Sequence, residues 1–151
     1  MYHSLDVAKF IVYCHVIKRK DITLGRLRIL MYYLQMYWLF TKGNPCFSET
    51  MYAWDVAPTE PHMYWYFRKK YKHYFIPAEH GSNELLDAEA RSFILNFVEQ
   101  IWYYDTFQLE VIARRQMPWV KNYCNYDTRE IPMSDMRAFA NELRKKQQDE
   151  A

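Results

Sequence analysis

The chain has 151 residues, of which 50% are apolar or aromatic and 19% are aromatic. Its 20 basic and 18 acidic residues leave a formal net charge of +2, too balanced to indicate a nucleic-acid-binding protein by itself. Only three glycines and six prolines argue against an all-β fold, which needs many tight turns. The length suits one domain, residues 1–151.

The first predicted helix covers residues 5–19 and is capped by Ser4, because Val7, Phe10 and Ile11 recur at helical spacing. Its connection leads directly into the most apolar stretch of the chain.

The most apolar stretch, residues 24–42, predicts a helix that begins after a Thr23 cap and ends at Gly43. From Ile29 onward it has almost no polar face, which is typical of a buried helix. We therefore expect a mainly α, compact helical domain built around this central helix.

The rest of the chain predicts one extended segment and further helices. Residues 46–54 partly alternate and favour extended structure, and Pro61 suits the first turn of a helix. A loop is expected over residues 76–84. The remaining helices are expected over residues 61–74, 87–103, 107–115 and 134–146, followed by a polar tail from about residue 147.

Neither a membrane span nor a secretion signal is expected. Arg26, Arg28 and Gln35 interrupt the apolar helix, and Asp6 and Lys9 interrupt the start of the chain. The three cysteines are odd in number and far apart, which suits free thiols in a cytoplasmic protein.

We find no motif of an enzyme, a metal site or a cofactor site. The histidines lack zinc-site spacing, and His62 and His73 are better explained as surface residues than as a metal pair. Cys14 and His15 are adjacent on a helix and point about 100° apart, so Cys14 is expected to be a buried structural thiol. We therefore expect a protein without enzymatic activity.

A cluster of basic residues follows tyrosines and a tryptophan in the helix predicted at 61–74. Arg68, Lys69, Lys70 and Lys72 could contact an acidic protein surface or a phosphate backbone, or could simply be a solvated helix face. A nucleic-acid-binding regulator using residues 68–72 is therefore the alternative function, although nucleic acid is the less favoured partner.

Five short motifs, in the same order along the chain, resemble the Panacea antitoxin domain, also called the SocA-like or phage-associated GepA-like family. The last of the five is Pro118-Trp119, and the resemblance continues beyond it to Ile131 and Phe139. The other four are LDVAKFI at 5–11, ITLGRLRILMYYLQ at 22–35, GNPCF at 43–47 and AWDVAPTEPHMY at 53–64.

Two positions depart from the family pattern. Ala57 stands where the family has glycine, and Ala113-Arg114 replaces a threonine–histidine pair, so no role of that histidine carries over.

The resemblance implies a cytoplasmic antitoxin, common in prophages, that neutralises a co-encoded toxin by direct protein–protein binding. One branch of the family is similar to a proteolytic adaptor that delivers its toxin to a Clp-type protease. The resemblance names no particular toxin.

One group of residues is our candidate for partner binding, and a second group, the motif residues, is expected to be structural rather than in direct contact with a partner. Trp65, flanked by Arg68, Lys69 and Lys72, has the composition of an interface anchor, although it could instead pack against the 77–83 loop. The motif residues are expected to form an ordered turn docked on the central helix, with Gln35 bonding the backbone of residues 53–60. They are Trp54, Pro58, Pro61 and Tyr64.

Overall fold

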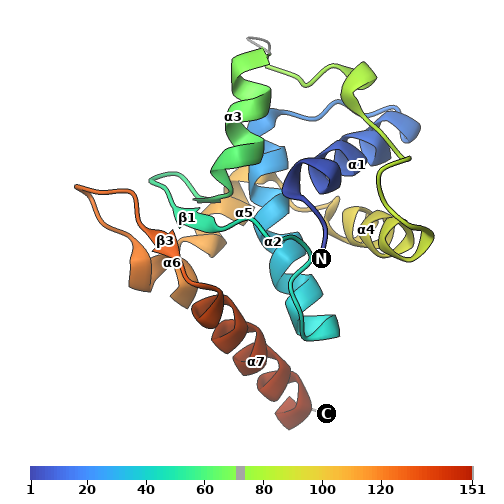
Figure 1. Ribbon diagram of the computed structural model, residues 1–151. Helices are drawn as coiled ribbons and strands as arrows, with labels where there is room; N and C mark the ends of the chain where they lie inside the picture. Colours follow the sequence, from blue (N-terminus) through green and yellow to red (C-terminus); the bar gives the residue numbers. More distant parts are fainter. Residues whose placement is uncertain (71–73, 151) are drawn as a thin grey trace.

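A computed structural model describes residues 1–70 and 74–150, which form a mainly helical domain with a small sheet (Figure 1). The helices over these residues are α1 Ser4–Ile17, α2 Leu24–Lys42, α3 Pro61–Lys70, α4 Ala88–Ile101, α5 Thr106–Ala113, α6 Met117–Asn122 and α7 Met133–Glu150. The strands are β1 Met51–Ala53, β2 Pro58–Thr59 and β3 Glu130–Ile131, and the short 3-10 helix η1 covers Ala78–His80.

Helix α2 is the centre of the domain, as predicted. The Thr23 hydroxyl accepts a hydrogen bond from the Arg26 amide at 3.0 Å, and Gly43 takes the left-handed conformation with φ of 80°. Between these ends α2 contacts α1, α3, α5, α7 and β2. Its nearly continuous apolar surface is therefore covered from several sides.

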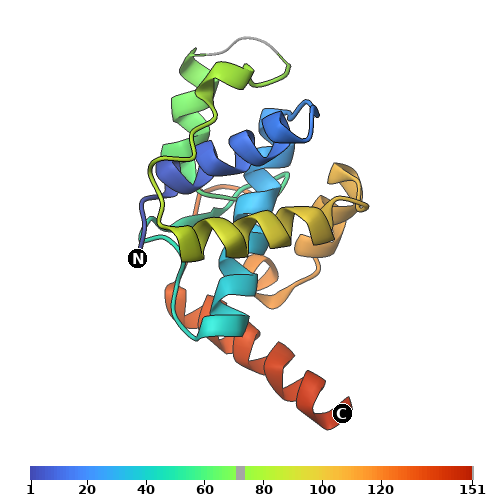
Figure 2. The same cartoon turned by 90° about the vertical axis from the view of Figure 1, so that its right-hand side faces the viewer.

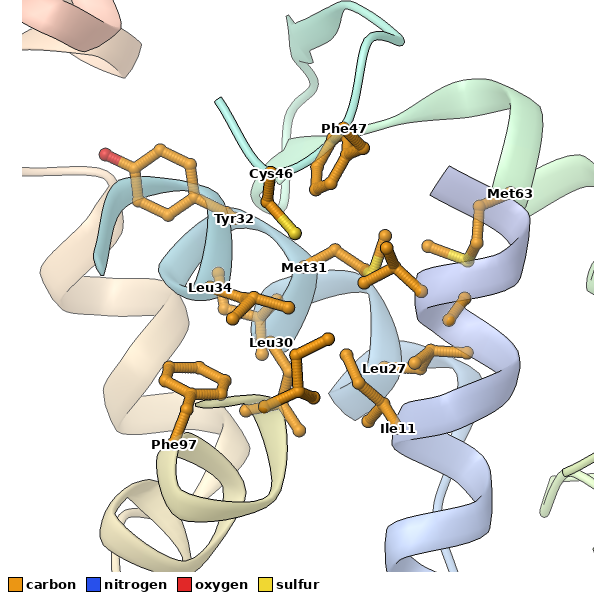
Figure 3. Packing of buried hydrophobic residues seen from close by; sticks show 14 of the residues in the cluster. Ile11, Leu27, Leu30, Met31, Tyr32, Leu34, Cys46, Phe47, Met63 and Phe97 are labelled. Atoms are coloured by element: carbon orange, nitrogen blue, oxygen red, sulfur yellow. The ribbon is translucent and has the colours of Figure 1, made fainter. Parts of the chain in front are cut away.

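The core is made where side chains from several helices meet around α2 (Figure 3). Ile11 from α1, Met63 from α3 and Phe97 from α4 point toward Leu30 and its neighbours on α2. Phe47 closes the same core from the extended segment that follows α2.

The sheet has the order β2-β1-β3 with antiparallel pairs. Tyr52 pairs with Thr59 on one side and with Glu130 on the other. This pairing brings β3, which lies just before α7, against β1 and close to the turn that leads to α3.

Helix α7 packs along α2, and its C-terminal end projects from the body of the molecule in both views (Figures 1 and 2). The Arg144 guanidinium donates to the carbonyl oxygens of Leu39 at 2.7 Å and Phe40 at 2.9 Å. A cation on the last carbonyls of α2 suits the negative end of that helix.

Several predicted helix ends were wrong. Ser4 does not cap α1: His3 occupies the cap position, and the Ser4 amide donates to the Glu49 carboxylate at 2.8 Å, so a distant side chain does the capping. The first helix ends at Ile17, earlier than residue 19, and over the described residues α3 covers Pro61–Lys70. The predicted continuation of α3 through residues 71–73 lies outside the described residues.

The C-terminal third also differs from the prediction. No helix was predicted after residue 115, whereas Pro118 is an early residue of a further helix, α6, where its missing N–H costs nothing. Helix α7 continues to Glu150, beyond the predicted end at residue 146. Within the described residues, no helix has the length and apolar character needed to cross a bilayer.

Candidate functional site

Side chains of the α5–α6 region hold the turn between β1 and β2, residues 54–57, by hydrogen bonds. The Trp119 indole N–H donates to the Trp54 carbonyl at 2.8 Å, and the Tyr123 hydroxyl donates to the Asp55 carboxylate at 2.7 Å. The Arg114 guanidinium donates to the Val56 carbonyl. Three side chains from one part of the chain therefore fix three successive residues of the turn.

Helix α3 begins immediately after this turn and is capped by a buried carboxylate. The Met63 amide donates to Glu60 at 3.0 Å, and the His62 amide donates to the same carboxylate. Burial raises the pKa of Glu60, and the hydrogen bonds from these backbone amides partly offset that rise. With Pro61 as its first residue, α3 leaves the turn in a defined direction.

Three aromatic rings from the turn and from α3 then meet. The Trp54 ring lies 5.2 Å from the Tyr64 ring and 5.9 Å from the Trp65 ring, measured between centroids. Tyr64 meets Trp65 edge-on at 5.4 Å. Of the three, Trp65 is the most open to solvent, with 48% of its surface exposed.

Beside these rings is a concave region that we call the Trp54 hollow, with a volume of about 580 Å³. Tyr126 is 96% exposed at its border, and Cys124 is half-buried. The full lining is Arg28, Ala53, Trp54, Asp55, Val56, Trp65, Cys124, Asn125, Tyr126, Asp127 and Thr128.

A second concave region of about 700 Å³, the Tyr64 hollow, adjoins the first and shares Arg28 and Val56 with it. Its other lining residues are Asp21, Thr23, Leu24, Gly25, Arg26, Tyr64, Arg68, Tyr74, Thr106 and Glu110. Of the described residues of the basic cluster, Arg68 is the one that lines this second hollow.

Arg28 stands between the two hollows. Its guanidinium lies 3.3 Å from the Glu110 carboxylate, and the two side chains are only 13% and 12% exposed. The same guanidinium lies 5.3 Å from the centroid of the Tyr64 ring, within the range of a cation–π contact. A mostly buried ion pair with an aromatic neighbour gives this wall a fixed geometry.

Two buried donors on this wall have no hydrogen-bond partner among the described residues. They are the Arg28 Nε and the Trp54 indole Nε1. Buried donors are normally satisfied, so two unpartnered donors are unusual in this part of the molecule.

The structure places the predicted interface residues as follows. Trp65 is exposed, as predicted, and lines the Trp54 hollow, which has no lining residue from the 77–83 loop. Arg68 and Lys69 are exposed, but Lys69 lines neither hollow. Lys72 lies outside the described residues.

The motif residues divide into two groups. Trp54 lines the Trp54 hollow, Tyr64 lines the Tyr64 hollow, and Trp119 holds the turn at Trp54. The three prolines lie in β2 or near helix starts. Pro58 and Pro118 are buried, while Pro61 is half-buried.

The prediction for Gln35 was wrong about which backbone groups its side chain bonds. Its side-chain oxygen accepts from the Cys46 amide at 2.8 Å and the Phe47 amide at 3.2 Å, and its nitrogen donates to the Phe47 carbonyl at 2.9 Å. These groups lie in the segment just after Gly43, not in residues 53–60. The reason is position along α2, since Gln35 lies beside the chain that returns after the helix ends.

Arg28 and the 124–128 loop belong to this site although the sequence did not predict either of them there. Arg28 was seen only as an interruption of an apolar helix, although a charge in a buried helix is itself a signal that a partner is present. Nothing in the local sequence indicates that residues 124–128 face Trp65.

Comparison with protein-family models, with curated proteins and with solved structures finds no match to this chain. The resemblance to the Panacea domain therefore remains an expectation from the motifs quoted above. The geometry of the Trp54 hollow is the basis for a functional proposal.

Proposed function

We propose that this chain is a non-enzymatic protein-binding domain that holds a side chain or loop of a partner protein in the Trp54 hollow. The observation that carries the proposal is the exposed pair Trp65 and Tyr126 beside a turn that three other side chains hold in place. Exposed tryptophan and tyrosine are typical interface anchors, and a rigid support lowers the entropy lost on binding.

The charges of the hollow favour a protein partner over nucleic acid. Its lining contains one cation, Arg28, and two carboxylates, Asp55 and Asp127. A phosphate backbone requires a positive surface, which this lining does not provide. A protein loop with mixed polar and apolar groups fits this lining.

We further propose that the partner is a toxin that the chain neutralises by direct binding, with delivery to a Clp-type protease as an extension. The five motifs that resemble the Panacea domain support this proposal, and three of them contribute to the Trp54 hollow: Arg28 and residues 53–56 line it, and Trp119 supports its turn. The free thiols Cys14, Cys46 and Cys124 suit the cytoplasm, where such a partner would be made.

Co-expression with the adjacent reading frame tests this function, with growth rescue and co-purification as readouts. We expect Trp65→Ala to lose rescue and to weaken binding at least about 30-fold, because a hot-spot tryptophan contributes about 2 kcal/mol or more. Tyr103→Ala is the matched control, since Tyr103 is 90% exposed and lines neither hollow.

Circular dichroism of both variants separates binding from folding. A folded Trp65→Ala variant that binds and rescues normally would contradict the Trp54 hollow as the partner site. Binding of the chain to its promoter DNA that weakens steeply with salt and depends on Arg68 and Lys69 would instead favour the alternative, a nucleic-acid-binding regulator.

A further inference from the structure

Three of the residues that line the Trp54 hollow are aromatic. Trp65 is 48% exposed and Tyr126 is 96% exposed, and the centroid of the Trp54 ring lies 5.9 Å from that of the Trp65 ring. In Figure 1 the 124–128 loop, in orange, which carries Tyr126, lies beside the turn between β1 and β2. The volume of about 580 Å³ is within the size range of ligand sites. The hollow therefore offers aromatic surface to a group that enters it.

Aromatic surface of this kind attracts cations. The face of a tyrosine or tryptophan ring is electron-rich, and tryptophan binds a cation most strongly. The chain already makes one such contact in this wall, since the Arg28 guanidinium lies 5.3 Å from the centroid of the Tyr64 ring. Arg28 reaches Tyr64 from α2, whereas Trp65 and Tyr126 are exposed to a cation from outside.

The charges of the lining favour a cation as well. Its charged members are Arg28, Asp55 and Asp127. The Arg28 guanidinium lies 3.3 Å from the Glu110 carboxylate, so its charge is balanced inside the protein. Asp55 and Asp127 are both exposed. Among the described lining residues, the solvent side of the hollow therefore presents two carboxylates beside its aromatic rings.

The cations close to this turn do not change that balance. The Arg114 guanidinium donates to the Val56 carbonyl and is not part of the lining. Arg68 lines the Tyr64 hollow but not the Trp54 hollow. Because the lining of the Tyr64 hollow has three arginines and two carboxylates, the two adjoining hollows differ in the sign of their charge. A cationic group is favoured in the Trp54 hollow.

From these rings and charges we propose that the Trp54 hollow takes an arginine side chain of the partner protein, with Asp55 and Asp127 as its acceptors. This inference rests on the proposed function, because it names the group by which the partner is held. A guanidinium fits better than an ammonium, since it stacks flat on an aromatic ring and donates two parallel hydrogen bonds to a carboxylate. The Tyr123 hydroxyl donates to Asp55 at 2.7 Å, so this acceptor is held in place before binding.

A capped Gly-Arg-Gly peptide tests the site without the partner. In an NMR titration it should shift the indole N–H signal of Trp65 and the amide signals of residues 124–128, with a dissociation constant on the order of 1 mM for a single side chain. The same peptide with citrulline in place of arginine keeps the planar shape and loses the charge, so its binding should be about tenfold weaker. A capped Gly-Glu-Gly peptide should leave these signals unchanged.

Two substitutions remove the charge of the acceptors and keep their shape. Asp55→Asn and Asp127→Asn should each weaken binding of the arginine peptide about three- to fivefold, and together about tenfold or more, because each removes one charged acceptor. Asp149→Asn is the matched control, since Asp149 is exposed near the end of α7 and does not line the hollow. The dispersion of the NMR spectrum verifies that each variant is folded.

The partner obtained by co-expression separates this inference from the proposed function. We expect the Asp55→Asn/Asp127→Asn chain to lose both the arginine peptide and the partner. If Trp65→Ala loses the partner while the double variant binds it normally, the proposed function stands and this inference fails. If Trp65→Ala binds the partner normally, both fail. Arginine and citrulline peptides that bind the wild-type chain equally would also overturn this inference, whatever the variants do.

Discussion

Replacing Gln35 with leucine should release the segment that follows α2. Gln35 is fully buried, and its amide group makes three hydrogen bonds to the backbone of Cys46 and Phe47. Both of those residues are buried as well, so water does not readily replace the lost partner. The Gln35→Leu variant would leave two amides and one carbonyl without the groups that satisfy them.

The expected loss of stability follows from those three backbone groups. A buried donor or acceptor that loses its partner costs about 1–3 kcal/mol, so the free energy of unfolding should fall by about 3 kcal/mol or more. Domains of this size have about 5–15 kcal/mol in total, so the variant should still fold at low temperature. Amide hydrogen exchange should accelerate most at Cys46 and Phe47 and little in residues 53–60.

Urea denaturation and residue-resolved hydrogen exchange measure these effects. Met36→Leu is the control, because Met36 is the next buried position of α2 and a volume-conserving apolar change costs less than about 1.5 kcal/mol. An unchanged urea midpoint in Gln35→Leu, or faster exchange confined to residues 53–60, would refute the reasoning.

A second variant keeps the test usable if Gln35→Leu does not fold. Gln35→Glu keeps the acceptors for the two amides but loses the donor when the carboxyl is ionised. Burial raises the pKa of such a carboxyl, and its protonated form can donate again. The stability of Gln35→Glu should therefore approach that of the wild-type chain as the pH falls.

Two further predictions test the support of the hollow and a buried histidine. Trp119→Phe should lower the free energy of unfolding by about 1–2 kcal/mol and speed amide hydrogen exchange in residues 54–57, because it removes the hydrogen bond to the Trp54 carbonyl. Urea denaturation and hydrogen exchange would show no such change if that hydrogen bond did not hold the turn. Burial lowers the pKa of His15, so the folded chain binds its proton less readily than the unfolded chain. Stability should therefore be lost as the pH falls below about 6.5, and the His15→Phe variant should lack that part of the loss. Thermal melts at a series of pH values measure this, and an equal pH dependence in the wild-type chain and the variant would contradict it.

The sequence by itself determined the central part of the fold. A long apolar stretch between a threonine cap and a glycine predicted α2 with its observed ends, since both caps are local features. The helical patterns also placed the starts of α4 and α5 to within about one residue, and the structure shows Asp87 and Asp105 capping these helices by accepting from backbone amides. Periodicity was less reliable at helix ends, where distant groups such as Glu49 replaced the expected local cap.

Only the tertiary structure decided the candidate site. Trp119 reaches Trp54 across 65 positions, and Arg28 reaches Glu110 across 82. The sequence marked Trp54 and Trp65 as unusual, and it marked Pro118-Trp119 as a motif, but it did not join them. Local patterns specify caps and buried faces through neighbours in the chain, whereas a hollow is made by contacts whose partners only the packing of the whole chain selects.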